Sequence, residues 1–198
     1  MILIPAKYYT GLGDKKETSI GNVHAAKSEP IFWAVGDIDE LNTKIGMLVA
    51  LLEKNKNEYA ISIKGGKLKL KDALLSIQSD LFSIGADIAS SANKAFVPKR
   101  RITRGDVQRL ESYADSMGSA FPGLSSFVLP GGCVEAAAAD EARAVARRAE
   151  RSVVNAANSF KIENVEILAY MNRLSSVLFV AARFINNANG VKETPPDY

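Results

Sequence analysis

The sequence of 198 residues contains 25 basic and 22 acidic side chains, and its net charge of +3 is too small to indicate binding to nucleic acid. Hydrophobic residues make up 47% of the chain and charged residues 24%, a balance typical of a soluble globular domain. Cys133 is the single cysteine, which excludes an internal disulfide bond and a multi-cysteine metal site, and no apolar run approaches the roughly 20 residues that span a bilayer.

We expect residues 1–27 to form an irregular N-terminal arm. Its centre, from Tyr9 to Ser19, reads YTGLGDKKETS. Glycines permit positive φ angles and a close approach of the backbone to a ligand, while threonine, serine and lysine supply donors that suit phosphate. The glycine spacing of a P-loop is absent. Two interpretations therefore stay open, a segment that binds phosphate and a flexible tail.

Four later segments carry apolar side chains at steps of three and four, which is the spacing of an amphipathic helix. In chain order the stripes are Ile38, Leu41, Ile45, Leu48 and Leu52; Leu70, Leu74, Ile77, Leu81, Ile84 and Ile88; Val107, Leu110, Ala114 and Met117; and Ile167, Met171, Leu174, Leu178, Ala181 and Ile185. No segment alternates convincingly as a strand does. We expect Ser28 to cap the first helix, with Pro30 in its opening turn, and Thr103 and Asp106 to cap the third.

Two charged segments accompany these stripes. Asp39 flanks the first stripe, within the sequence GDIDELN from Gly36 to Asn42. Its carboxylate either holds an arginine, with Arg143 as the candidate, or faces solvent. The basic run Lys99–Arg101 is expected to lie on a solvated face or loop, because nucleic-acid-binding proteins show a broader basic surface.

The segment from Val134 to Ala157 predicts a helix with a stripe of small residues. This stripe consists of Ala138, Ala142, Val145 and Ala149, so a neighbouring backbone or a ligand can come close. Arg143, Arg147 and Arg151 are spaced by four and share a face, and guanidinium groups bind phosphate as bidentate forks. The alternative is a solvated face with Glu150 and Asp140 as partners within the helix.

Two further features flank this helix. The apolar loop FVLPGG, from Phe127 to Gly132, precedes it and either closes the core or contacts a ligand; its proline and glycines mark a turn. Asn172 follows the stripe residue Met171, where a polar amide needs a partner. The single histidine, His24, lies in the arm, which excludes a ferritin-like di-iron centre and a Ser-His-Asp triad.

The predicted fold is an all-α, five-helix bundle that forms one domain over residues 1–198. Loops are expected near residues 54–66, 93–102, 118–132 and 158–163. The tail, residues 190–198, contains Pro195 and Pro196 and is predicted to be mobile. With no signal-peptide core near the N-terminus, we expect a cytoplasmic protein without a membrane or nucleic-acid partner.

The order of these motifs resembles one family, the trimeric ATP:cob(I)alamin adenosyltransferases of the propanediol-utilisation type. The likeness runs from about Tyr9 to Ile185 and comprises the glycine-rich arm, VGDIDELN, FVLPGG, RRAER and MNRLS. RRAER followed by NRLS is the most specific pair. In the arm, Gly11 replaces a basic residue of the family, Leu12 a small polar residue and Lys16 a glycine, so two phosphate donors are missing.

The resemblance implies a set of site residues. ATP would be bound by Thr10, Gly11, Leu12, Gly13, Asp14, Lys15, Thr18, Ser19, Lys27, Arg147, Arg148, Ala149, Glu150, Arg151 and Asn172. Asp39 would pair with Arg143 across a subunit boundary of a homotrimer, and Phe127 would pack beside the corrin. The sequence gives no direct evidence for a metal site. The implied Mg²⁺ would be carried mainly by the ATP phosphates, with Glu150 as a candidate ligand.

The resemblance also implies the reaction. Cob(I)alamin attacks C5′ of ATP, triphosphate leaves and adenosylcobalamin forms, which makes the protein a transferase with Arg147, Arg143, Asp39 and Phe127 in its catalytic site. A flavoprotein reductase and a B12-dependent acceptor enzyme are candidate partners. Two alternatives stay open: a non-catalytic bundle that senses ATP or carries a corrinoid, and an interaction bundle without a small ligand.

Overall fold

The computed structural model describes residues 9, 11, 13–20, 23–55, 57–93, 95–123, 126–160 and 162–197. Within these residues the chain forms five helices, α1 (Pro30–Lys54), α2 (Leu70–Ala92), α3 (Arg104–Gly118), α4 (Val134–Ser159) and α5 (Glu166–Ala188). Four short strands pair into two antiparallel hairpins, β1 (Glu17–Ile20) with β2 (Val23–Ala26) and β3 (Ala60–Ile63) with β4 (Gly66–Lys69). The predicted all-α, five-helix fold is confirmed.

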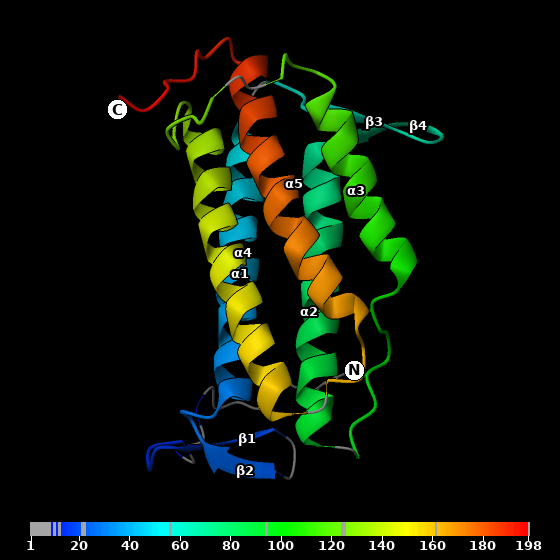
Figure 1. Cartoon of the computed structure of the whole chain (residues 1–198), viewed down its shortest axis with the longest axis vertical. Helices are drawn as coiled ribbons and strands as arrows, with labels where there is room; N and C mark the ends of the chain where they lie inside the picture. Colours follow the sequence, from blue (N-terminus) through cyan, green and yellow to red (C-terminus); the bar gives the residue numbers. More distant parts are fainter. Residues whose placement is uncertain are drawn as a thin grey trace.

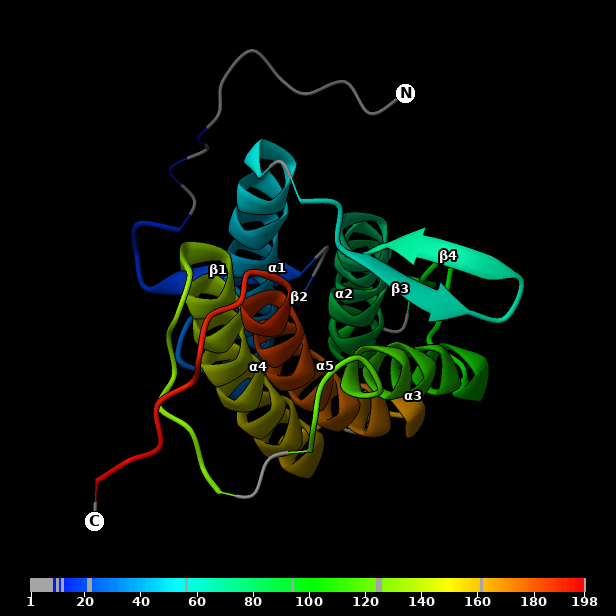
Figure 2. The same ribbon diagram turned by 90° about the horizontal axis from the view of Figure 1, so that it is seen from above.

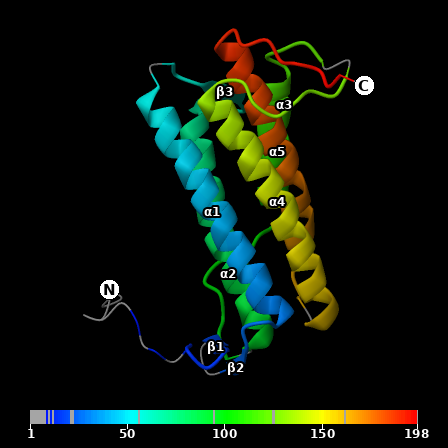
Figure 3. The same cartoon turned by 90° about the vertical axis from the view of Figure 1, so that its left-hand side faces the viewer.

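The long helices α1, α2, α4 and α5 stand side by side, and α3 packs against α5 (Figure 1). Seen from above, α1 and α2 form one side of the bundle and α4 and α5 the other (Figure 2). The β1–β2 hairpin lies at the end of the bundle where α1 begins, and the β3–β4 hairpin lies at the opposite end (Figures 1 and 3). The bundle therefore has an α1–α2 side and an α4–α5 side, and a short hairpin lies at each of its two ends.

The apolar stripes predicted from the sequence form the core. Each predicted stripe residue is buried except Ala114, which is half-buried. The small stripe of α4 is also buried, and this helix packs against both α1 and α5. Alanine side chains allow such close approach on two sides, because little volume separates the backbones.

The helix starts are partly as predicted. Thr103 and Asp106 form a capping box at the start of α3, which confirms that prediction. The prediction for Ser28 is wrong, because Glu29 is the N-cap residue of α1 and makes no capping hydrogen bond through its side chain. Pro30 does occupy the first turn, where its missing N–H costs no intrahelical hydrogen bond.

The expectation that the chain contains no strands is wrong. The β3–β4 hairpin turns at Lys64 and Gly65, where Gly65 has a φ of 104° that suits glycine. The sequence AISIKGGKLK alternates over four residues on either side of this turn, and Ile61 is buried while Ser62 donates its N–H to Ser116 Oγ at 2.8 Å. The strands are so short that the alternation is easily overlooked.

The basic run at residues 99–101 lies in a loop as expected, but two of its arginines reach inward. Arg100 donates to Asp80 and to Asp106, both at 2.7 Å, and Arg101 pairs with Asp87 at 3.5 Å. Asp80 is 2% exposed and also accepts hydrogen bonds from Arg109 and Tyr170. This carboxylate therefore joins α2, α3, α5 and the loop between α2 and α3.

The chain after α5, predicted to be mobile, makes specific contacts. Leu129 donates its N–H to the carbonyl of Thr194 at 2.8 Å, and Glu193 pairs with the buried Arg183. Helix α5 is long and apolar enough to cross a membrane by length and composition, but more than half of that stretch is buried against the other helices, as in the core helix of a soluble bundle.

Replacing Asp80 by asparagine tests the internal ion cluster. Asp80→Asn removes the charge that faces Arg100 and Arg109, and we expect the free energy of unfolding to fall by about 2–3 kcal/mol, because the partly exposed arginines are screened by water. The control is Glu141→Gln, which breaks a surface pair with Lys44 and should cost less than about 1 kcal/mol. Equal effects in urea unfolding would contradict this role of Asp80.

Candidate functional site

The arginine face of α4 is the first component of the site. Arg147 borders two adjoining hollows, one of about 330 Å³ shared with Glu150, Arg151 and Asn172 and one of about 250 Å³ shared with Arg143. The predicted common face of the three arginines is therefore confirmed. Among the described residues, neither Arg147 nor Arg151 has an ion-pair partner, so both guanidinium groups are free to bind an anion.

A chain of hydrogen bonds fixes the polar groups beside these arginines. Asn172 on α5 donates to Glu150 on α4 at 3.0 Å, and Arg173 donates to Asn172 Oδ1 at 2.7 Å. Arg173 is held in turn by Glu111 on α3 at 2.9 Å. Glu150 is thus the hydrogen-bond partner that Asn172 requires. The two side chains hold each other in place and line the larger hollow.

Arg148 and Ala149 point away from this face. One residue further along a helix turns the side chain by about 100°, so Arg148 meets α1, where it pairs with Asp37 at 3.5 Å and with Glu40. The hydrogen bond to Glu40 raises the pKa of Arg148. Ser152 also donates to Asp37, at 2.5 Å, and Ala149 lies in the core. These contacts fix the rotation of α4 about its axis.

The arm supplies a second group of polar residues at the start of α1. A Cβ atom on Gly13 would lie 3.1 Å from Lys27 Nζ, so the arm folds its glycine against this ammonium group. Lys27 also donates its N–H to the carbonyl of Lys16 at 3.0 Å. Two of the predicted ATP-binding residues are therefore neighbours. Thr10 and Leu12 lie outside the described residues.

The backbone of the arm explains one departure from the family pattern. Lys16 has a φ of 68°, in the left-handed region that favours glycine, and it stands where the resembled family has a glycine. Gly11 has a φ of 72° and accepts a hydrogen bond from the N–H of Asp14 at 3.3 Å. The described Lys15 is exposed. The turn is thus kept although its glycine is not.

An apolar cavity of about 570 Å³ lies between α1, α2 and β1. Thr18, Ser19, Asp39 and Asn42 contribute its polar atoms, and the 72% exposed ring of Phe82 is part of its wall. Asn42 is 6% exposed, yet its Oδ1 atom has no hydrogen-bond partner. A buried amide oxygen without a partner is unusual, and here it borders a cavity large enough for a small molecule.

Asn42 and Phe82 were not predicted as site residues. The sequence contains a hint of the role of Asn42, because a polar residue follows Leu41 on a stripe of apolar side chains. It contains no hint for Phe82, since a phenylalanine next to Leu81 on an apolar helix is expected to pack in the core.

Asp39 and Arg143 are not paired within one chain. Asp39 is exposed on the α1–α2 side, whereas Arg143 contacts Asp140 at 3.2 Å on the α4–α5 side. The cavity and the arginine hollows share no lining residue: the cavity is lined by α1, α2 and β1, and the hollows by α4 and α5. Figure 2 shows these two helix pairs on different sides of the bundle. Among the described residues, the polar groups that β1 contributes and the arginine face of α4 therefore border separate hollows of one chain.

The loop before α4 is not a core closure. Phe127 is 81% exposed and Leu129 is half exposed, so this loop presents apolar side chains to solvent. Gly131 and Gly132 follow with φ angles of 144° and 103°, which lead the chain sharply into α4. The reading of this segment as mere core packing is wrong, and an exposed apolar loop is more typical of a binding surface.

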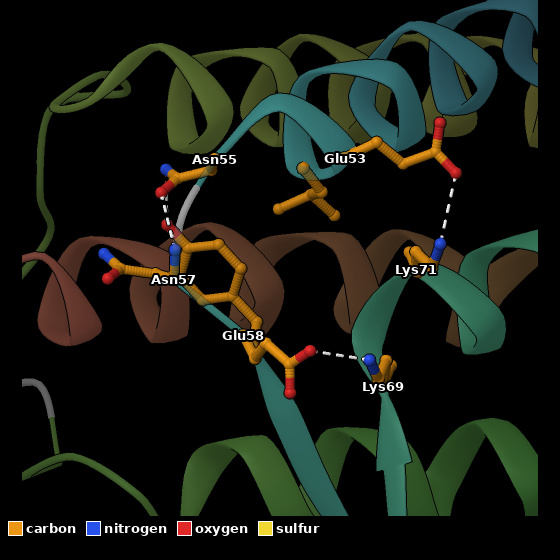
Figure 4. A pocket seen from close by; sticks show the side chains of 8 residues that line it. Glu53, Asn55, Asn57, Glu58, Lys69 and Lys71 are labelled. Carbon is orange, nitrogen blue, oxygen red and sulfur yellow. Dashed lines mark hydrogen bonds and ion pairs between the residues drawn. The ribbon is translucent and has the colours of Figure 1, made fainter.

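Another pocket, at the far end of α1, is a weaker candidate. Its volume is about 130 Å³, and its two lysines are already paired, Lys69 with Glu58 at 2.7 Å and Lys71 with Glu53 at 3.2 Å (Figure 4). Asn57 donates its N–H to Asn55 Oδ1 at 3.0 Å. The charges around this pocket are satisfied internally.

A metal ion would find few protein ligands here. The part of the chain that the structure describes contains no group of three or more histidine, cysteine, aspartate or glutamate side chains that could hold a metal ion. Among the described residues that line the larger hollow, Glu150 supplies the one carboxylate. One carboxylate fits Mg²⁺, which is commonly bound through one or two carboxylates together with the phosphates of a substrate.

Fold and site together define a helical-bundle protein with an arginine face suited to an anion, an apolar cavity and an exposed aromatic loop. The sequence profile of the cobalamin adenosyltransferase family matches residues 8–185. The chain belongs to this family.

Relatives from other organisms are similar to this chain over nearly its whole length. The corrinoid adenosyltransferase of Mycobacterium leprae is 35% identical over 195 residues, which cover 96% of each chain, and that of Bacillus subtilis is 36% identical over 185 residues, which cover 93% of this chain and 89% of the relative. A PduO-type ATP:corrinoid adenosyltransferase from Lactobacillus reuteri, a phenylalanine-to-histidine variant solved with cobalamin and ATP, aligns with a TM-score of 0.82 and 32% identity over 96% of both chains.

Proposed function

We propose that this protein transfers the 5′-deoxyadenosyl group of ATP to the cobalt of cob(I)alamin, forming adenosylcobalamin and triphosphate. The single observation that carries the proposal is the arginine face of α4, where Arg147 and Arg151 have no ion-pair partner within the described part of the chain and lie beside the Glu150–Asn172 pair. The family membership of residues 8–185 supports the same reaction. The protein is a transferase that uses ATP and a corrinoid as substrates.

The chemistry requires stabilisation of a leaving group. The bond between C5′ and the triphosphate oxygen breaks while the cobalt electron pair forms the Co–C bond, so Co(I) becomes Co(III) and the triphosphate gains negative charge. Arg147 and Arg151 would receive this charge in preset positions, which is the most effective form of electrostatic catalysis. No proton is transferred in this step, so no general base is needed.

Mg²⁺ is proposed as the companion of ATP. It would neutralise phosphate charge and orient the chain of phosphates, held mainly by their oxygens with Glu150 as the protein ligand. The hydrogen bond from Asn172 to Glu150 would keep this carboxylate turned toward the larger hollow.

We propose that the complete site forms between the subunits of a homotrimer. Thr18 and Ser19 border the cavity on the α1–α2 side of one protomer, and the arginine face lies on the α4–α5 side. Gly13 and Lys27, which are neighbours, belong to the same arm. Asp39 and Arg143 have opposite charges on these two sides and are not paired with each other in one chain. Arg143 contacts Asp140 through Nε, so its two terminal nitrogens would be the ones that pair with Asp39 of a neighbouring copy. A closed ring of three copies would repeat this contact at each boundary.

Phe127 is proposed to cover the lower face of the corrin. Cobalt is difficult to reduce to Co(I) while a lower axial ligand donates to it, and an apolar ring in that position would exclude both water and the base of the cofactor. The 81% exposure of Phe127 supports this role, because the ring is available for contact with a ligand. The two glycines after it allow the loop to turn beneath the corrin.

A non-catalytic ATP sensor or corrinoid carrier is the alternative from another class. Release of triphosphate from ATP and reduced cobalamin distinguishes it, because a carrier does not turn over. A cytoplasmic location and cooperation with a flavoprotein reductase and a B12-dependent acceptor enzyme complete the proposal, since Co(I) must be generated and the product must be used.

Replacing Arg147 tests the catalytic face. With purified protein, Mg-ATP and cob(I)alamin, the spectrum of adenosylcobalamin should appear together with triphosphate. Arg147→Ala should weaken ATP binding by about 1.5–3 kcal/mol, because a charged hydrogen-bond partner is lost, while the helical content is kept. Arg147→Lys should recover only part of the lost ATP binding, since an ammonium group cannot form the two parallel hydrogen bonds of a guanidinium group. Wild-type kinetics in the alanine variant would contradict a role in ATP binding and would favour the alternative, a solvated helix face.

The assembly is tested through Asp39. Light scattering on a size-exclusion column should give about three times the chain mass of 21.3 kDa. Asp39→Ala should weaken the trimer and ATP binding together, because the pairing partner of Arg143 is lost. Asp115→Ala, an equivalent change at an exposed residue of α3, should leave both unchanged. If the wild-type protein is a monomer at micromolar concentration, the proposed homotrimer is wrong.

The role of Phe127 is tested by changing the oxidation state of the substrate. Phe127→Ala should leave ATP binding nearly intact but strongly reduce adenosylation that starts from cob(II)alamin with a reductant. The defect should shrink when cobalamin is chemically reduced to Co(I) beforehand. Because the ring is exposed, its loss should not lower the melting temperature. Equal losses in both assays would decide against a role at the cobalt.

A further inference from the structure

The loop that carries Phe127 is held by residues distant in sequence. Leu129 donates its N–H to the carbonyl of Thr194 at 2.8 Å. The side chain of Asn186 on α5 donates to the carbonyl of Gly131 at 2.9 Å and accepts from the N–H of Cys133 at 3.1 Å. The backbone between Phe127 and α4 is thus fixed by α5 and by the chain that follows it.

The contact with Asn186 depends on the absence of a side chain at Gly132. A Cβ atom there would lie 2.2 Å from Asn186 Oδ1, and the φ of 103° also favours glycine. Asn186 is 1% exposed, so its amide has no water to turn to if the loop moves away. The amide and the loop therefore hold each other in one position.

A buried set of charges continues this contact. Arg183 is 2% exposed, donates to Asp140 at 2.6 Å and pairs with Glu193. Glu193 accepts from Asn186 at 3.0 Å, and Asp140 accepts from the N–H of Gly131 at 3.3 Å. Breaking one buried partner leaves the others uncompensated, so the tail, α5 and the loop are expected to dock as one unit.

We infer that Asp140, Arg183, Asn186 and Glu193 form a C-terminal clasp, a set of positioning residues that places the Phe127 loop for its contact with the corrin. The inference rests on the proposed function of Phe127. Asp140 also contacts Arg143 at 3.2 Å, so the clasp links the loop to the proposed subunit boundary. The C-terminal segment thereby belongs to the corrin site although it contributes no side chain to the arginine face.

The first measurement reports the loop without any substrate. Phe127→Trp in a Trp33→Phe background gives one tryptophan on the loop, whose fluorescence anisotropy and quenching by iodide follow its mobility and exposure. Glu193→Ala should lower the anisotropy and raise the quenching, and the milder Glu193→Gln should do so less. Asp197→Ala removes an exposed carboxylate from the same segment and should change neither. An unchanged signal in both Glu193 variants overturns the clasp.

The second measurement concerns the substrate. With native Phe127 and Mg-ATP present, electron paramagnetic resonance of bound cob(II)alamin should show a several-fold smaller four-coordinate fraction in Glu193→Ala than in wild type. ATP binding and turnover from pre-reduced cob(I)alamin should stay close to wild type, which a general loss of folding would not permit. Glu193→Gln keeps a hydrogen-bond acceptor and should fall between the two.

The two measurements separate the ways to fail. If the loop probe responds to Glu193→Ala but the cob(II)alamin spectrum does not, the role toward the corrin is overturned. If Phe127→Ala also leaves that spectrum unchanged, the fault lies in the proposed function of Phe127. If Phe127→Ala changes the spectrum and neither Glu193 variant does, the proposed function stands and the clasp falls.

Discussion

The close packing of α4 between α1 and α5 is the constraint on which the rest of the structure depends. Its stripe of alanines buries one side of the helix, and the contacts of Arg148 and Ser152 with Asp37 lock its rotation. With a fixed rotation, the residues spaced by four from Arg143 to Arg151 have to face outward. A core of larger side chains would hold α4 further from α1 and leave this direction less well defined.

Arg147 and Arg151 on this face have no ion-pair partner among the described residues, and such neighbouring guanidinium groups are unfavourable in an isolated protein, because like charges on one face repel each other. A bound anion would remove this repulsion, and the triphosphate of ATP is the anion that the proposed function supplies. The polar parts of the bundle thus divide into two kinds. Asp80, Asp106 and Arg109 satisfy each other internally, whereas Arg147 and Arg151 are left for a ligand.

The sequence predicts the helices well and the site in part. Apolar steps of three and four identify the core because burial of one helix face leaves a regular pattern. The same logic fails for the β3–β4 hairpin, where four residues are too few for a period. It also fails for Arg100, Arg183 and Asn186, since their partners come from distant segments and no local spacing reveals them. The face that Arg147 shares with Arg143 and Arg151 could be predicted because the three residues are spaced by four within one helix, but the exposure of Phe127 could not.

The left-handed conformation of Lys16 has a consequence for the strength of nucleotide binding. Holding a residue with a Cβ atom there costs roughly 1 kcal/mol more than holding a glycine. When an arm orders only around its ligand, this strain is subtracted from the binding free energy, and about 1.4 kcal/mol corresponds to a tenfold change in affinity. Compared with glycine, Lys16 therefore gives the arm a turn that is more costly to form and one more positive charge.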